Sequence, residues 1–174
     1  MAEAVAASST DNIAVTPAAL ARLLALLVPA ALLAGAYGSQ YIGGLTPCEM
    51  CWWQRYAHFA ALVPALLAFT ARAASTRSRA LVLLAALAIA ISGGIGFYQA
   101  GVELHIFEGF TTCTSTAHGT STADLLKQIM AAPLVRCDEI QWSWLGISMA
   151  GWNAIVSLGS ALAILILTLR GRRA

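Results

Sequence analysis

Residues 80–102 read ALVLLAALAIAISGGIGFYQAGV and contain no charged side chain. A helix that crosses a membrane needs about 20 consecutive apolar residues, so this stretch is long enough to span a bilayer. Lipid offers the backbone no hydrogen-bond partners, and a spanning segment of this kind must therefore be helical. The stretch predicts a transmembrane helix over 80–102.

Three further apolar stretches predict three more helices of the same kind. The second stretch along the chain is interrupted by Gln54, Arg55 and His58, all close to its start. We expect an all-α membrane protein built as a four-transmembrane-helix bundle. The expected helices cover about 20–42, 52–71, 80–102 and 147–169.

The composition of the whole chain supports a membrane protein. Of its 174 residues, 59% are hydrophobic and only 10% are charged, and the mean hydropathy is +0.75. A soluble domain has about 25% charged residues, so a soluble globular protein is excluded. The net charge of +2 is small. The basic residues also form no single stripe, which argues against nucleic acid as a partner.

The distribution of Lys and Arg predicts the orientation of the bundle. Seven of the ten basic residues fall on one side of the expected helices, and an excess of Lys and Arg is typical of the cytoplasmic side. We therefore expect both termini to be cytoplasmic and the loops 43–51 and 103–146 to face outward. The seven residues are Arg22, Arg72, Arg77, Arg79, Arg170, Arg172 and Arg173.

The chain reads as one membrane domain with two tails. We expect residues 1–16 to be a disordered cytoplasmic tail, because they are rich in Ala, Ser and Thr. Residues 17–170 form the membrane domain, and 171–174 are a second cytoplasmic tail. Thr16 followed by Pro17 predicts the start of the first helix, with Thr16 as its cap and Pro17 in its first turn.

The long outer loop carries a pattern typical of a short amphipathic helix. Leu125, Ile129 and Met130 recur at helical spacing within Ala123–Ala131, and Thr122 is placed to cap the helix. Such a helix can lie flat on the membrane surface. It can equally pack as a hydrophobic lid on the ends of the membrane helices, and the sequence does not choose between these two arrangements.

All four cysteines, Cys48, Cys51, Cys113 and Cys137, fall on the outward side. Disulfides form and persist outside a bacterial plasma membrane or in the lumen of the endoplasmic reticulum. A structural disulfide suits the distant pair Cys113 and Cys137. It suits Cys48 and Cys51 poorly, because closing a loop of two residues constrains almost no chain entropy. The Cys-Glu-Met-Cys motif therefore favours a redox function.

Arg55 follows Cys51 by one helical turn, so the two side chains share a helix face. A helix start and a permanent cation both favour the thiolate form of a cysteine, which is the form that reacts in disulfide exchange. His58 can lie on the same face. Arg55 can instead anchor the helix end in lipid headgroups, and a histidine such as His58 is typical of interface packing.

A zinc site is the other interpretation of two cysteine pairs. Zinc ligands are usually spaced two to five residues apart within each pair, whereas Cys113 and Cys137 lie far apart in the sequence. His105 and His118 keep no ligand spacing with these cysteines. We therefore expect no metal site.

Together these features resemble the DsbB family of bacterial membrane proteins. The resemblance is carried by the PCEMC motif at 47–51 followed by Arg55, by the four helices, and by a second cysteine pair after the third helix. Residues 137–149, CDEIQWSWLGISM, are similar to that family's lead into its fourth helix. The resemblance covers the chain from about Leu23 to Leu169.

The resemblance implies a thiol:quinone oxidoreductase of the bacterial inner membrane. Its partner would be a periplasmic thioredoxin-like thiol oxidase, similar to DsbA, which it would reoxidise and so generate disulfides de novo. Two electrons would pass to ubiquinone or menaquinone in the membrane quinone pool, without a metal. The protein would be a multi-pass membrane protein with periplasmic catalytic loops.

The family mechanism assigns a role to each cysteine. The reduced partner would attack Cys113 and release Cys137, and Cys137 would then attack Cys48. Cys51 would be left as a thiolate against the quinone, with Arg55 stabilising its charge. We expect the quinone to be bound by Cys51, Arg55 and His58.

One feature departs from the family pattern. Its members often carry a histidine near the outer end of the third helix, where this chain has Phe97-Tyr98-Gln99 and then His105. Either Gln99 or His105 takes the place of that histidine.

Two other functions fit parts of the pattern. The chain is similar in its chemistry to the vitamin K epoxide reductase family, but that family usually places its CxxC motif near the last helix rather than at the start of the second. A non-catalytic membrane protein with disulfide-stapled outer loops is the second alternative. Replacing Cys48 or Cys51 separates that alternative from an enzyme.

Overall fold

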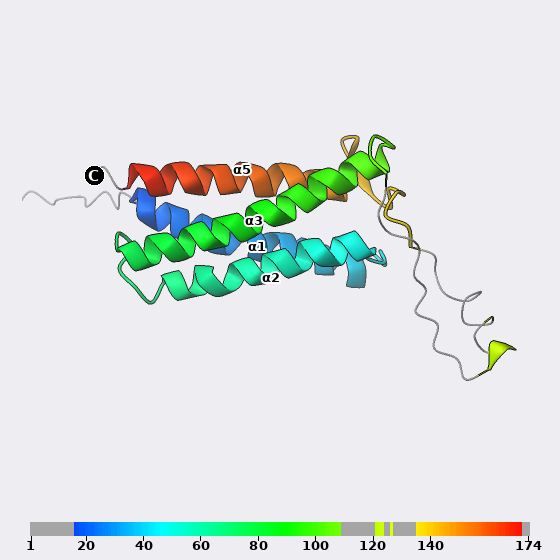
Figure 1. The fold of residues 1–174 in the computed structure, drawn as a ribbon, viewed down its shortest axis with the longest axis horizontal. Coiled ribbons are helices and arrows are strands. Elements are labelled where there is room, and N and C mark those ends of the chain that lie inside the picture. The colour runs from blue at the N-terminus through cyan, green and yellow to red at the C-terminus, as the bar shows by residue number, and fades with distance from the viewer. Residues whose placement is uncertain (1–15, 109–120, 124–125, 127–134, 172–174) are drawn as a thin grey trace, which may run out of the picture.

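A computed structural model describes residues 16–108, 121–123, 126 and 135–171. Within these residues it contains four long helices that run side by side in an elongated bundle (Figure 1). Neighbouring helices along the chain alternate in direction. The helices are α1 (Pro17–Tyr41), α2 (Glu49–Ala68), α3 (Thr76–Glu103) and α5 (Met149–Arg170). The expected all-helical fold is confirmed.

Three of these helices, α1, α3 and α5, are long and apolar enough to cross a membrane. In α2 the apolar run contains Gln54, Arg55 and His58, which lower its hydropathy. The start of α1, the link between α2 and α3 and the end of α5 all lie at one end of the bundle (Figure 1). The membrane crossing by α2 and the cytoplasmic position of the termini stay predictions.

Side-chain caps fix where the helices begin. Thr16 caps α1 as expected, since its Oγ1 accepts a hydrogen bond from the Ala19 amide at 3.2 Å. The helix expected from residue 52 already begins at Glu49, because the Sγ of Cys48 accepts from the Cys51 amide. Similarly, α3 begins at Thr76 rather than at residue 80, because Ser75 caps its first turn.

A short hairpin precedes α5 and was not expected. Its strands β1 (Ser143–Trp144) and β2 (Ile147–Ser148) pair in antiparallel fashion. The two turn residues, Leu145 and Gly146, have φ angles of 52° and 77°, as a two-residue hairpin turn requires. The fourth helix therefore begins at Met149 instead of residue 147.

The end of the bundle that holds the start of α1 is filled mainly by alanines. Small side chains let membrane helices approach closely. Glycine serves the same purpose between α3 and α5, where a Cβ on Gly96 would lie 2.9 Å from the Ala150 carbonyl oxygen. The buried cluster contains Ala21, Ala25, Ala61, Ala65, Ala68, Val82, Ala85, Ala86, Ile89 and Ile164.

Several expectations fall outside the described residues. These are the tails at 1–15 and 172–174, Cys113, and most of the amphipathic helix expected over Ala123–Ala131. Of that helix only residues 123 and 126 are described, and both are helical.

Candidate active site

The CxxC pair lies at the start of α2, at the end of the bundle opposite to the alanine cluster. Cys48 caps the helix and is 3% exposed, while Cys51 in the first turn is partly exposed. Their Sγ atoms lie 2.8 Å apart. The free N–H groups of the helix start face this position, and they favour a negative charge on sulfur.

Cys137 packs against this pair although it lies far from it in the sequence. It is 5% exposed and belongs to one buried cluster with Cys48 and Met50, against which Cys51 is also packed. The structure thus brings three of the four expected catalytic cysteines together. Cys113 lies outside the described residues.

Arg55 is buried inside the bundle, with 5% of its surface exposed. Its guanidinium donates to the Gln40 side-chain oxygen at 2.5 Å and to the Ala36 carbonyl oxygen at 3.0 Å, both on α1. The same group lies over the rings of Tyr37 and Trp52, at 4.8 and 4.9 Å. These contacts hold the cation within the protein, which argues against the headgroup anchor.

Gln99, close to the C-terminal end of α3, contacts both sulfurs of the CxxC pair. Its Nε2 lies 3.5 Å from the Sγ of Cys48 and 3.7 Å from the Sγ of Cys51. His105, by contrast, is exposed beyond the end of the helix, with a φ of 56°. Of the two residues left open by the sequence, the structure places Gln99 at the site.

A buried network of polar side chains continues from Gln99 into the bundle. Gln54 donates to Gln99 at 2.7 Å, and Asn153 on α5 donates to Gln54 at 2.7 Å. The Nε2 of His58 lies 2.9 Å from both the Asn153 oxygen and the Ser92 hydroxyl. His58 therefore belongs to this network, and the network joins α2, α3 and α5.

A pocket of about 530 Å³ opens beside the sulfurs. Its polar walls include Cys51, Arg55, His58 and Gln99, which come from α2 and α3. Its apolar wall is formed largely by α1. The residues of that wall are Ala31, Leu32, Leu33, Gly35 and Ala36.

Comparison with known proteins matches this arrangement to one family. The model of the family described as disulfide bond formation protein DsbB matches residues 18–167. The chain belongs to the DsbB family. Its members are thiol:quinone oxidoreductases, so this chain is an enzyme of disulfide bond formation with membrane-spanning helices.

Curated relatives named disulfide bond formation protein B are similar over most of their length. The protein of Marinobacter nauticus is 30% identical over 140 residues, covering 76% of this chain and 80% of the relative. That of a Polaromonas species is 31% identical over 159 residues, covering 86% and 90%. That of an Azoarcus species is 33% identical over 155 residues, covering 83% and 87%. No solved structure matches the chain.

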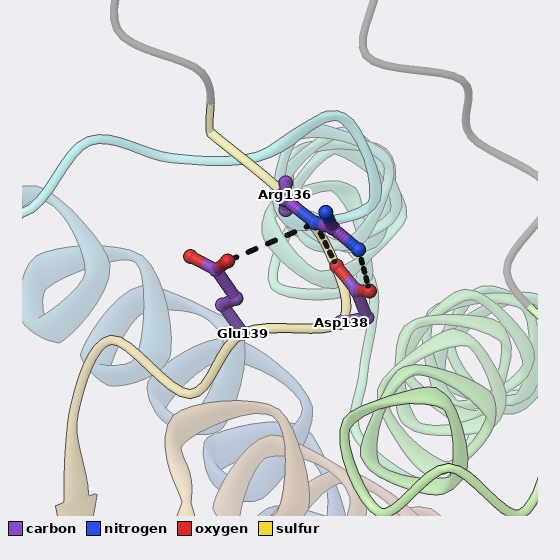
Figure 2. A network of polar contacts seen from close by, with 3 residues as sticks. All are labelled: Arg136, Asp138 and Glu139. Carbon is purple, nitrogen blue, oxygen red and sulfur yellow. Dashed lines mark hydrogen bonds and ion pairs between the residues drawn. The ribbon is translucent and has the colours of Figure 1, made fainter.

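In this DsbB family member, Arg136, the residue before Cys137, forms ion pairs with two carboxylates. Arg136 contacts Asp138 at 2.5 Å and Glu139 at 3.7 Å (Figure 2). The Arg136 guanidinium lowers the pKa of Asp138 to about 2. Arg136 and Glu139 also line the pocket. Both ion pairs lie within the segment 136–139, so they fix the local shape of the loop that carries Cys137.

Within the ranges that the structure describes, no three His, Cys, Asp or Glu side chains are grouped so that they could hold a metal ion.

The sequence assigned no role in the site to Gln40, Gln54, Ser92 or Asn153. The available signal was their polarity, since each is an uncharged polar residue within an apolar helix. Gln54 and His58, like Asn153 and Ser157, are four residues apart, a spacing that places both members of a pair on one face.

Proposed function

We propose that this protein reoxidises a periplasmic DsbA-like dithiol oxidase and passes the two electrons to a membrane quinone. The observation that carries the proposal is the burial of Cys137 against Cys48 at the edge of a pocket that Cys51 also lines. Exchange between the two cysteine pairs would therefore end at Cys51, beside a pocket able to hold an electron acceptor.

The thiol part of the reaction needs exchange between the two cysteine pairs. The partner's thiolate attacks Cys113 of a Cys113–Cys137 disulfide and releases Cys137 as a thiolate. Cys137 then attacks Cys48 of the Cys48–Cys51 disulfide, which releases Cys51. The packing of Cys137 against Cys48 supports this order. The partner resolves its bond to Cys113, and the Cys113 thiolate then attacks Cys137, which restores the Cys113–Cys137 disulfide and releases Cys48. The two electrons are then held by the reduced pair Cys48 and Cys51.

The residues around the pocket fit a quinone such as ubiquinone or menaquinone. Ligand pockets are mostly apolar cavities of about 300–1,000 Å³ with a few polar groups that fix the ligand's orientation. Here α1 supplies the apolar wall, and Arg55 and Gln99 supply N–H donors. When bound, a quinone supplies an acceptor for two electrons and two protons.

The protein's own side chains prepare the sulfur and hold the pocket. The positive charge of Arg55 and the N–H groups of Gln99 favour a thiolate at Cys51. His58 contributes by fixing α2 to α5 through Asn153, and it lines the inner part of the pocket. These are the roles we propose for the predicted site residues.

We also propose that α2 is the fourth membrane span. Its polar side chains Gln54, Arg55 and His58 are buried inside the bundle, while its exposed side chains are apolar or aromatic over most of its length. A lipid-facing surface of this kind is what a spanning helix needs. Together with the excess of Arg at the opposite end, it supports an inner-membrane protein with cytoplasmic termini and a periplasmic site. The apolar surface includes Tyr56, Phe59, Val63, Leu66 and Leu67.

The test is quinone reduction by purified protein driven by two different dithiols. We expect Cys48→Ser and Cys51→Ser to abolish turnover with both a reduced thioredoxin-like partner and dithiothreitol. Cys113→Ser is the matched variant: it should lose turnover with the partner but keep turnover with dithiothreitol, because the CxxC pair is intact. Full activity of Cys51→Ser would reject the proposal and favour a non-catalytic membrane protein whose outer loops are linked by disulfides.

A further inference from the structure

Glu103, the last residue of α3, is a buried carboxyl group that the proposed function leaves without a role. It is 9% exposed and lines the same pocket as Cys51. Buried carboxyl groups are rare, and those in membrane segments are usually functional.

The contacts of Glu103 connect it to the sulfurs. Its Oε1 accepts a hydrogen bond at 3.1 Å from Gln99 Nε2, the nitrogen that also contacts the sulfurs of Cys48 and Cys51. Its Oε2 makes no hydrogen bond of full geometry among the residues that the structure describes, and the Ser148 side chain lies near the carboxyl group. One oxygen is thus held by Gln99, and the other can carry a proton.

The chemistry of the site moves protons as well as electrons. When two thiols become a disulfide, they release two electrons and two protons. Both electrons and both protons are taken up by the quinone of the proposed function, on which this inference rests. The protons start on sulfur at the edge of the pocket and must end on oxygen within it.

We propose that Glu103 carries one of these protons. As a carboxylate, Glu103 accepts a proton from the reduced pair Cys48 and Cys51, and this leaves Cys51 as the thiolate of the pair. As a carboxylic acid it then donates that proton to the acceptor in the pocket, while Cys51 gives up its electrons and its bond to Cys48 forms. Glu103 returns to the carboxylate, and the second proton comes from the remaining thiol.

The other charged or titratable groups near the pocket suit this role less well. An arginine stays protonated, and the cysteines are the electron donors. Glu139 is paired with Arg136 and its side chain is 67% exposed. The Nε2 of His58 is engaged by Asn153 and Ser92. Its Nδ1 has no partner among the described residues, but His58 reaches Gln99 only through Asn153 and Gln54, whereas Glu103 contacts Gln99 directly. Ser148 at the end of β2 is neutral. The groups that face or line this pocket are Cys48, Cys51, Arg55, His58, Arg136, Cys137 and Glu139.

The variant that tests the role is Glu103→Gln. It keeps an oxygen that can accept from Gln99 and removes the exchangeable proton. The matched control is Glu108→Gln, which removes an exposed carboxyl group from the same outer side. Unfolding temperatures of both variants show whether the fold is retained, and Glu103→Asp restores a carboxyl group if it is not.

The first readout needs no quinone. Infrared difference spectra between the reduced and oxidised quinone-free protein should show a carboxyl group that becomes protonated on reduction. We expect this band in the unaltered protein and in Glu108→Gln, and we expect it to be lost in Glu103→Gln. A band that persists in Glu103→Gln, or no band in the unaltered protein, would overturn the proposal.

The second readout is quinone reduction. Losing a positioned acid–base group lowers rates by about 10²–10⁴-fold, so Glu103→Gln should slow quinol formation by about 100-fold or more. Oxidation of the partner dithiol in a single turnover without quinone should be retained. A Glu103→Gln protein as fast as the unaltered one rejects this role alone, whereas an unaltered protein that reduces no quinone rejects the proposed function itself.

Discussion

The guanidinium of Arg55 on α2 donates a hydrogen bond to the Gln40 side-chain oxygen on α1 at 2.5 Å. The cation is thereby held one helical turn from Cys51, at the wall of the pocket. Its position depends on a residue of another helix, which the sequence around the CxxC motif does not reveal.

Replacing Gln40 should therefore disturb both stability and quinone use. Gln40→Leu removes an acceptor from a buried cation, and hydrogen bonds to charged groups contribute about 1.5–3 kcal/mol. We expect the free energy of unfolding to fall by about that amount and the apparent KM for quinone to rise. Gln40→Glu keeps the acceptor and should keep the fold, while its negative charge offsets that of Arg55 and slows turnover. Unaltered stability and KM in Gln40→Leu would contradict this role.

The packing of Cys137 against Cys48 predicts which disulfide forms between the two loops. In the double variant Cys51→Ser, Cys113→Ser, mild oxidation should yield a Cys48–Cys137 disulfide, seen by mass spectrometry of proteolytic fragments. The matched variant Cys48→Ser, Cys113→Ser leaves Cys51, which is packed against this cluster rather than buried in it. Its disulfide should form more slowly. Equal rates in the two variants would show that Cys137 does not select Cys48.

Two neighbouring glycines of α3 should respond to alanine in opposite directions. A Cβ on Gly96 would lie 2.9 Å from the Ala150 carbonyl oxygen and 3.2 Å from the Ala154 amide nitrogen, so the backbone of α5 must move. Overpacking of this kind destabilises by about 1–3 kcal/mol. Gly94 has no atom within 4 Å of such a Cβ, and alanine favours a helix by up to about 1 kcal/mol. Unfolding in detergent measures both changes, and a stable Gly96→Ala protein would refute the close contact.

Asp138 should stay ionised far below neutral pH. Arg136 lowers its pKa to about 2, compared with about 3.9 for an unperturbed Asp. The stabilising ion pair is thus fully present above about pH 4 and is lost as the pH falls through about 2. A carboxyl carbon-13 titration by NMR should show this midpoint, and Arg136→Gln should return it to the ordinary range. A midpoint near 3.9 in the unaltered protein would contradict the pairing.

The sequence predicted the helices well because lipid imposes a simple rule. Long uncharged runs must be helical in a bilayer, and Thr16 with Pro17 marked the start of α1 correctly. The starts of α2 and α3 were predicted late, at residues 52 and 80 instead of Glu49 and Thr76, and the start of α5 was predicted early, at 147 instead of Met149. Charged and polar residues such as Glu49 and Arg77 suggested loops, but they lie in first turns that Cys48 and Ser75 cap.

From the residues alone, the candidate site was predictable only where its members are close in sequence, and Cys137 and Gln99 were named through the family resemblance. Cys51 and Arg55 are one turn apart, so their shared face follows from helical periodicity alone. Gln54, Gln99 and Asn153 meet only when three helices pack together, and neither their spacing nor their chemistry encodes that meeting. The hairpin before α5 was missed because its strands have two residues each, too few to show an alternating pattern.

The alanine cluster at the far end of the bundle has a consequence for the direction of electron flow. Its ten buried side chains close the bundle with small apolar groups, while the cysteines lie at the opposite end. Small hydrophilic reductants and ions that approach from the alanine end meet packed apolar side chains and find no polar path to the sulfurs.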